Sequence, residues 1–340
     1  MKSAAIRVPL HIGEETRRKL KREGILREDL YPKREDNFLI LPVTREVEGF
    51  ELFEDEFRPK GERINTYKDV VEIPDEKLKK LLPTSYDMIG DIALIKIPQE
   101  LRKYREEIGK ALLKAHKNIR AVYHAEPVSG ELRTRKLEFL AGERKTRTLY
   151  REYGIEMEVD IAKVFFSPRL SRERYRIAKL VRDGEIVIDM FAGCAPFSLM
   201  IAKYANPKIV YAIDINREAV KLAVENVKRN KLLHKIEIME GDSSKIVREL
   251  AEKGVRADRI IMNLPFGARE FLPDALTVSK KGTYIHYYAI VRESDIENHI
   301  EYLKKVSNNC IDVVDINKIK TYAPREFYTC FDIIVNRKPA

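Results

Sequence analysis

The stretch from Ile186 to Pro196 constrains the fold of this chain more than any other. It reads Ile-Val-Ile-Asp-Met-Phe-Ala-Gly-Cys-Ala-Pro: a β-branched run ends at Asp189, small residues make a turn, and a helical pattern follows. A strand, a tight loop and a helix N-terminus in this order direct backbone N–H groups toward a ligand. The next strand ends at Asp214, about twenty residues beyond Gly193, where a nucleotide-binding βαβ unit places the acid that binds a ribose.

This loop differs from the two common phosphate-binding loops. It is not G-x-G-x-x-G, and it has no Walker lysine. Its single glycine and tight turn suit a compact nucleoside better than a pyrophosphate. A purely structural strand-to-helix turn explains the same residues equally well.

Strand and helix patterns alternate from residue 186 to residue 306. Such alternation predicts a mostly parallel sheet with helices on both faces. The last two strands, 311–319 and 327–335, have no helix between them and predict an antiparallel hairpin at the edge. The expected fold class is therefore α/β, a Rossmann-like class I methyltransferase domain with a seven-stranded, mostly parallel sheet.

The charge pattern favours a polyanionic partner, with one reservation. The chain has 340 residues, a formal charge of +10 and 35% charged residues. Gln occurs once and Trp is absent, which is typical of proteins from hot environments, so part of the charge is expected to form ion pairs.

No apolar run approaches the roughly 18 residues of a membrane span, and no signal peptide is expected. Three widely separated cysteines predict a reducing cytoplasm and no structural metal (Cys194, Cys310, Cys330).

Composition and punctuation divide the chain into four parts. Residues 1–61 are expected to form a small α+β module, and residues 62–83 a charged linker with Pro74 and Pro83. Residues 84–165 are expected to form a middle α+β domain, and residues 166–340 the catalytic domain. The middle domain carries dense positive charge suited to a phosphate backbone (Arg133, Arg135, Arg144, Lys145, Arg147).

Four strand ends of the predicted sheet carry polar residues where a ligand lies in such folds. The first strand end gives Asp189–Gly193, and the second gives Asp214, placed for ribose hydroxyls. The third gives Asp242, placed for an adenine amino group, and the fourth gives Asn263-Leu264-Pro265-Phe266. Singly each has a structural explanation, Asp214 as a helix N-cap and Asp242 as a turn residue. Together they favour S-adenosylmethionine. The last loop resembles the Asn-Pro-Pro-aromatic loop of enzymes that methylate planar nitrogens, although Leu264 departs from it and makes a simple exocyclic amine less favoured.

Several motifs together are similar to the archaeal and eukaryotic tRNA (guanine-37-N1)-methyltransferase family. The resemblance covers nearly the whole chain and is weakest before Tyr86. One departure is Cys194-Ala195, where many relatives carry a second small residue or glycine. The motifs are Leu137–Glu143, Phe166–Leu170 with Glu173-Arg174, Asp189–Gly193, Asn263–Pro265, His286–Tyr288 and Tyr322–Glu326.

The resemblance implies a chemistry for the site. N1 of guanine holds a proton at neutral pH, so its methylation needs a base, and the family pattern assigns Glu173. Arg133 would stabilise negative charge on O6, Asn263 would bind the guanine edge, and Pro265 would stiffen its loop. The same pattern puts Arg174 on the cofactor carboxylate. The expected cofactor residues are Arg174, Phe165, Phe191, Gly193, Asp214, Ile215, Asp242, Ser243 and Asn263.

The resemblance also implies that the partner is tRNA and that the enzyme acts as a monomer. Its N-terminal module would contact the tRNA elbow, while the other domains grip the anticodon arm. The expected location is the cytoplasm. The target base would leave its stack. Structural readings remain beside these roles, with Glu173 as a first-turn helix acid, Arg133 as a phosphate contact and Phe165 as core.

Three other functions are alternatives to this one. One is a relative that also methylates C7 of the wyosine precursor 4-demethylwyosine, and another transfers an aminocarboxypropyl group. The second should lack the pair Glu173 and Arg133. A non-catalytic RNA-binding protein is disfavoured by the intact set of Asp214, Asp242, Asn263 and Glu173.

Overall fold

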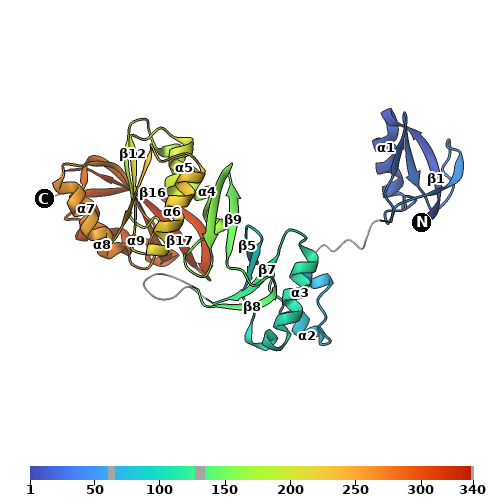
Figure 1. Ribbon diagram of the computed structural model, residues 1–340, viewed down its shortest axis with the longest axis horizontal. Coiled ribbons are helices and arrows are strands. Elements are labelled where there is room, and N and C mark those ends of the chain that lie inside the picture. Colours follow the sequence, from blue (N-terminus) through green and yellow to red (C-terminus); the bar gives the residue numbers. More distant parts are fainter. Residues whose placement is uncertain (60–65, 127–134, 338–340) are drawn as a thin grey trace. The chain divides into compact units, whose positions relative to one another are not determined.

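The computed structural model describes residues 1–59, 66–126 and 135–337. The chain divides into two compact units, Met1–Val70 and Val71–Ala340, whose elements are traced in Figure 1. The division falls inside the charged stretch 62–83 that the sequence marks as a linker. Among the described residues, none of the helices combines the length and the apolar character needed to cross a bilayer.

The first unit is a four-stranded sheet with one long helix. The strands pair in the antiparallel order β2-β3-β1-β4. The strand β1 buries Ile6 and Val8 on one face of this sheet and Ala5 on the other. The helix α1 begins directly after Pro9 and packs Leu20 on that sheet. The elements are β1 (Lys2–Pro9), α1 (Leu10–Arg22), β2 (Lys33–Glu35), β3 (Phe38–Pro42), β4 (Leu52–Glu56) and a 3₁₀ turn (Tyr67–Asp69).

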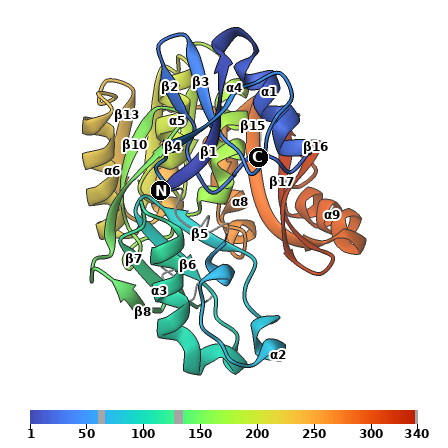
Figure 2. The same ribbon diagram turned by 90° about the vertical axis from the view of Figure 1, so that its right-hand side faces the viewer.

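The second unit opens with a smaller sheet in the order β5-β6-β7-β8. Its strands β6 and β7 are parallel, and all their residues are buried. The helix α3 packs beside β7 and β8 (Figure 2). The strand β5 pairs with β6 across a turn at Gly90. The elements are α2 (Glu76–Lys79), β5 (Tyr86–Ile89), β6 (Ile92–Ile95), a 3₁₀ turn (Gln99–Tyr104), α3 (Arg105–Ala115), β7 (Ala121–Ala125) and β8 (Leu137–Gly142).

A hairpin and a helix lead from this sheet to the larger one. The hairpin turns at Tyr153-Gly154 and consists of β9 (Arg147–Glu152) and β10 (Ile155–Asp160). A 3₁₀ turn (Pro168–Leu170) and α4 (Ser171–Leu180) follow. Two asparagines hold the hairpin from α6 (Arg217–Arg229): the buried Asn226 exchanges hydrogen bonds with the backbone of Glu158, and the half-buried Asn230, which follows the last residue of the helix, does so with the backbone of Glu156.

The larger sheet has the strand order β13-β12-β11-β14-β15-β17-β16. The pairs from β13 to β15 are parallel, whereas β15–β17 and β17–β16 are antiparallel. The strands are β11 (Ile186–Asp189), β12 (Ile209–Asp214), β13 (Ile236–Glu240), β14 (Ala257–Met262), β15 (Ser279–Arg292), β16 (Ile311–Ala323) and β17 (Glu326–Val335).

Helices cover both faces of this sheet, as alternation predicts. One core joins α4, α5, α6 and the β9–β10 hairpin to one face, and a second joins α7, α8 and α9 to the other (Figure 1). The β11 residues Val187 and Ile188 are fully buried on opposite faces. The helices are α5 (Pro196–Tyr204), α6 (Arg217–Arg229), α7 (Ser243–Glu252), α8 (Ala268–Thr277) and α9 (Ile296–Val306), the last preceded by a 3₁₀ turn (Glu293–Asp295).

Candidate active site

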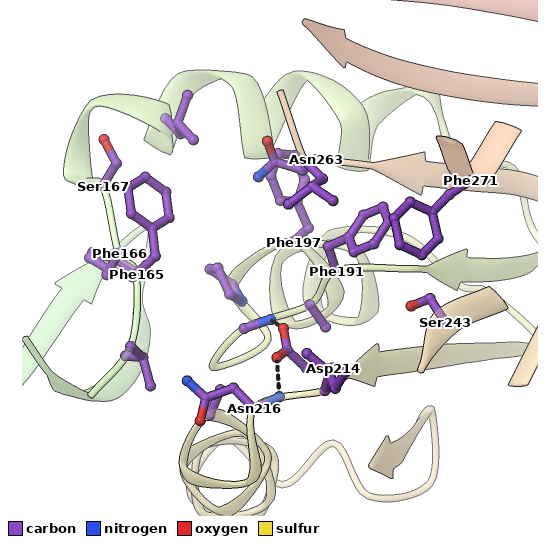
Figure 3. Close-up of a pocket in the computed structure, with 18 of the residues that line it drawn as sticks. Phe165, Phe166, Ser167, Phe191, Phe197, Asp214, Asn216, Ser243, Asn263 and Phe271 are labelled. Atoms are coloured by element: carbon purple, nitrogen blue, oxygen red, sulfur yellow. Dashed lines mark hydrogen bonds between the residues drawn. The ribbon is translucent and has the colours of Figure 1, made fainter. Parts of the chain in front are cut away.

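A cavity of about 390 Å³ lies beyond the carboxyl ends of β11, β12 and β14. Its wall is completed by the segment that leads into α4 and by the first turns of α5, α6, α7 and α8. Figure 3 shows aromatic side chains facing this space from several elements, among them Phe165, Phe191 and Phe271. A pocket at this edge of a parallel sheet is where such folds bind ligands.

The loop after β11 is shaped by two left-handed residues. Gly193 has φ 57° and Ala195 has φ 66°, and the second is a strained value for a residue with a Cβ. Together they turn the chain sharply into α5, whose first residue is Pro196. Asp214 supports the loop from β12, because its Oδ2 accepts the N–H of Gly193 at 2.6 Å and its Oδ1 accepts the N–H of Asn216 at 2.9 Å (Figure 3).

Two acids at these strand ends have raised pKa values. Burial raises the pKa of Asp214, against the two backbone N–H groups that favour its charged form. Asp189 is fully buried, and desolvation together with the nearby Asp214 raises its pKa to about 7. Its Oδ2 accepts from Ser198 at 2.8 Å, whereas its Oδ1 has no partner among the described residues.

Helix caps supply further polar groups to the wall. Asp242 caps α7 by accepting from the backbone N–H of Ser244, so the structural reading of this residue holds while it also lines the cavity. Asn216, rather than Asp214, caps α6. The Ser243 hydroxyl donates to the carbonyl of Met190, which joins the third strand end to the first.

The Arg174 guanidinium pairs with a partner that the sequence does not reveal. It donates to both carboxylate oxygens of Glu152 at 2.6 Å each and to the carbonyl of Ser167 at 3.2 Å. Both side chains are almost fully buried. Glu152 ends β9, so the pair joins the hairpin to α4 and leaves Arg174 in the cavity wall with few free donors.

The loop after β14 presents an amide and an aromatic ring. The Asn263 Oδ1 accepts from the hydroxyl of Tyr328 on β17. Pro265 is buried, while Phe266 is 58% exposed and meets the exposed Tyr322 edge to face, with ring centroids 5.8 Å apart. The loop therefore fixes Asn263 from behind and leaves an aromatic pair open to solvent.

The structure brings all nine expected cofactor residues into one wall: Arg174, Phe165, Phe191, Gly193, Asp214, Ile215, Asp242, Ser243 and Asn263. Pro265 and Glu173 are not in that wall. The Glu173 side chain is 2% exposed and accepts from Arg176 at 2.7 and 2.8 Å and from the Tyr288 hydroxyl at 2.7 Å. Tyr288 packs on Phe197 of the wall, so Glu173 lies one side chain behind it. Arg133 lies outside the described residues.

Two lining acids escape the sequence analysis. Glu270 and Asp274 stand one turn apart on α8, a spacing that looks like an ordinary solvated helix face. With Asp214 and Asp242 they put four carboxyl groups on the described wall. Asp274 is paired with Arg248, and the one arginine of the described wall, Arg174, is paired with Glu152. This electrostatic balance suits a ligand that carries positive charge and hydrogen-bond donors.

Much of the predicted positive charge is already paired. Lys145 contacts Asp91 at 2.5 Å, and Arg147 contacts Glu158 at 3.0 Å as well as Glu225. Arg135 lies 3.9 Å from Asp87. This is the ion pairing expected of part of the charge, and it reduces the phosphate-binding capacity of the middle domain.

Three segments of the chain match models of known protein families. Residues 148–315 match the family model of the TRM5/TYW2 methyltransferase domain, residues 68–146 that of the TYW2 N-terminal domain, and residues 5–51 that of the tRNA methyltransferase 5 N-terminal domain. The tRNA (guanine(37)-N(1))-methyltransferase Trm5b of Pyrococcus abyssi is 44% identical over 337 residues, which cover 98% of this chain and 99% of that protein. The chain belongs to the TRM5/TYW2 methyltransferase family.

Members of the family differ in the reaction they carry out. The tRNA(Phe) (4-demethylwyosine(37)-C(7)) aminocarboxypropyltransferase of Pyrococcus horikoshii is 34% identical over 268 residues, covering 78% of this chain and 93% of that protein. Among solved structures, a complex of aTrm5 with tRNALeu matches with a TM-score of 0.81 at 37% identity, covering 98% of this chain and 99% of that one. Methanocaldococcus jannaschii Trm5 in complex with adenosine matches with a TM-score of 0.68 at 35% identity, covering 98% of this chain and 100% of that one.

Proposed function

We propose that this protein transfers a methyl group from S-adenosylmethionine to N1 of guanosine 37 in tRNA. The observation that carries the proposal is the single wall on which Asp214, Asp242 and Asn263 meet at three strand ends. The 44% sequence identity to a tRNA (guanine(37)-N(1))-methyltransferase, over nearly the full length of both chains, supports this reaction over the others of the family.

The residues of the wall fit this cofactor. When bound, S-adenosylmethionine supplies an electrophilic methyl group on a sulfonium centre. Asp214 can accept from ribose hydroxyls while it holds Gly193, and Asp242 can accept from an adenine amino group. Apart from Asp274, which is paired with Arg248, the carboxyl groups of the wall favour a ligand that bears a sulfonium and an ammonium group.

We assign proton removal to Glu173. The N1 proton of guanine must leave as the methyl bond forms, and a carboxylate can accept it. Glu173 lies one side chain behind the wall, so a local movement has to bring it and the guanine edge together. Its partner Arg176 is 26% exposed and is the donor with room to move. Asn263 is assigned to the guanine edge and Pro265 to the stiffness of the loop, as the family pattern implies.

We place the RNA around this site. The exposed rings of Phe266 and Tyr322 can stack on unpaired bases of the anticodon loop. The unit Met1–Val70 is assigned to the tRNA elbow and the stretch 84–165 to the anticodon arm. Arg133 is assigned to the negative charge on O6 of guanine, as the family pattern implies. We further propose a cytoplasmic enzyme that acts as a monomer, since one chain carries every residue assigned here.

A transfer assay tests the function. Labelled S-adenosylmethionine is incubated with a tRNA transcript that carries G37 and with the same transcript carrying A37. We expect label in the first alone, and loss of turnover with retained cofactor affinity in Glu173→Ala. If the G37 transcript acquires no label, the proposal is wrong. A third arm, with tRNA carrying 4-demethylwyosine, tests the bifunctional alternative.

A further inference from the structure

A line of buried charged side chains ends on Glu173. It crosses the larger sheet from the residue before β11 to α4, on neighbouring elements. Five of its six members are less than 10% exposed, the exception being Arg176. The order is Glu185, Arg259, His286, Asp332, Arg176 and Glu173.

The half of the line far from Glu173 has one hydrogen-bonding pattern. Arg259 donates to both oxygens of Glu185 at 2.8 and 3.0 Å, and its Nη1 lies 2.7 Å from Nε2 of His286. A guanidinium can only donate, so Nε2 accepts and Nδ1 carries the imidazole proton. Nδ1 then donates to Oδ1 of Asp332 at 2.6 Å, its direct partner in the β15–β17 ladder.

The same pattern excludes a metal at this cluster. His286, Cys330 and Asp332 lie close enough to share an ion. Both nitrogens of His286 are already in hydrogen bonds, and Nη2 of Arg176 lies 3.4 Å from the Cys330 sulfur. A cation would face two guanidinium groups at short range, so the cluster is an ion-pair line and not a metal site.

The half near Glu173 shares one arginine between two acids. Arg176 donates from Nε and Nη2 to Glu173 and from Nη1 to Oδ2 of Asp332 at 2.7 Å. Burial opposes the charge of both groups, yet their hydrogen bonds hold the pKa of Asp332 well below its ordinary value and raise that of Arg176. Asp332 therefore stays ionised and keeps Arg176 charged.

We propose that Asp332 is a positioning residue for proton removal, because it gives Arg176 a second carboxylate and lets Glu173 take up a proton without leaving the half-buried guanidinium unpaired. This inference rests on the function proposed above. The line holds two arginines, three carboxyl groups and a neutral imidazole, so it carries one excess negative charge while Glu173 is ionised. Proton uptake by Glu173 from N1 of guanine removes that excess.

Removing the charge of Asp332 should therefore weaken Glu173 as a base. In Asp332→Asn, Arg176 keeps one carboxylate partner, and protonation of Glu173 would strand the guanidinium. The other groups that face Glu173 stay in place, namely Tyr288 on β15 and Cys330 on β17. A neutral amide of the same size preserves an acceptor for His286.

The experiment is a rate–pH profile for methyl transfer to the G37 transcript. For Asp332→Asn we expect the acid limb to move about one pH unit lower and kcat at pH 8 to fall about three-fold. The KM for tRNA and the cofactor affinity should not change. The matched control is Asp312→Asn, the same change on the exposed strand β16, where Asp312 bonds only to Asn336 among the described residues.

A second variant keeps the test decisive if Asp332→Asn does not fold. Arg176→Gln removes the cation from Glu173, so the acid limb should move to higher pH, and Asp332→Glu should restore part of the wild-type profile. Opposite shifts in the two variants support the inference. Profiles that coincide with that of Asp312→Asn, or shifts in the same direction, overturn it. If wild-type protein leaves the G37 transcript unmethylated, it is the proposed function that fails.

Discussion

Asp214 shows how one side chain can serve both the fold and the ligand. Its two oxygens hold the backbone of Gly193 and Asn216, and its remaining lone pairs face the cavity. We expect Asp214→Ala to weaken S-adenosylmethionine binding at least ten-fold, because one ribose acceptor and the shape of the loop are lost together. Titration calorimetry measures this, with Asp312→Asn as the control. Unchanged affinity would remove Asp214 from the site.

Asp189 makes stability depend on pH in a direction opposite to most carboxyl groups. Its pKa is about 7 in the folded protein, above the ordinary 3.8, so the folded state holds the proton more tightly than the unfolded chain. Its contribution is complete below about pH 4 and is lost as the pH rises through about 7.

Asp189→Asn removes this dependence. We therefore expect the free energy of unfolding of wild type minus that of the variant to fall by about 2–4 kcal/mol between pH 4 and pH 8. Urea unfolding at both pH values measures it, and groups such as Asp332 cancel in the difference. A difference that rises with pH would show that Asp189 is ionised throughout.

At the scale of elements, the β9–β10 hairpin depends on α6. Asn226 is fully buried; its Oδ1 accepts the N–H of Glu158, and its Nδ2 donates to the carbonyls of Glu158 and Cys194. Asn226→Ala would leave buried backbone groups unpaired and should lower the free energy of unfolding by about 2–4 kcal/mol. Urea denaturation tests this, with the exposed Lys228→Ala as a control that should cost little.

The loop after β14 and the hairpin β16–β17 together present the pair Phe266 and Tyr322. A base stacked on such rings gains about 1–3 kcal/mol. Tyr322→Ala should therefore raise the KM for tRNA about ten-fold without changing cofactor affinity, and Tyr322→Phe should retain most of it. Steady-state kinetics with saturating cofactor measures both. An unchanged KM in the alanine variant would place the RNA elsewhere.

Sequence patterns predict elements well and long-range partners poorly. The alternation of strand and helix gives the order of the large sheet's elements, since period and loop length are local properties. The strand β15 begins at Ser279, where the sequence still continues a helix-like run, because pairing with β14 sets its start. Arg174 and Glu152 come together only when the β9–β10 hairpin has folded onto α4, so local sequence patterns do not predict this ion pair.

The same limit applies to the site. Asp214, Asp242 and Asn263 follow strands, so their convergence is predictable from topology. Glu270 and Asp274 reach the wall only because α8 packs with one face toward it. The placement of Glu173 behind Tyr288 depends on how α4 packs against β15, which the motif around His286–Tyr288 does not encode.

The whole molecule consists of two units with separate cores. Residues such as Ile6, Leu20 and Leu41 form the interior of the first unit without help from the second. A variant that lacks residues 1–70 should therefore fold and bind S-adenosylmethionine as the full chain does. Its kcat/KM for whole tRNA should fall about ten-fold or more, as expected when a linked second contact is lost.

An anticodon stem-loop is the matched substrate for this variant. It lacks an elbow, so full-length and shortened proteins should methylate it equally. A deficit that is the same on both substrates would mean that the first unit acts on the catalytic site and not on the elbow.

The turn at Gly90 has a consequence for how this protein can diverge. Gly90 has φ 56°, and a Cβ there would lie 2.1 Å from the Thr148 hydroxyl, which bonds to the backbone and carboxylate of Asp91. Thr148 begins the stretch that matches the methyltransferase domain, while Gly90 lies in the one matched before it. The two matched segments are therefore in close contact at Gly90 and Thr148. A chimera that takes one segment from a relative should fold well only if the residues on both sides of this contact come from the same protein.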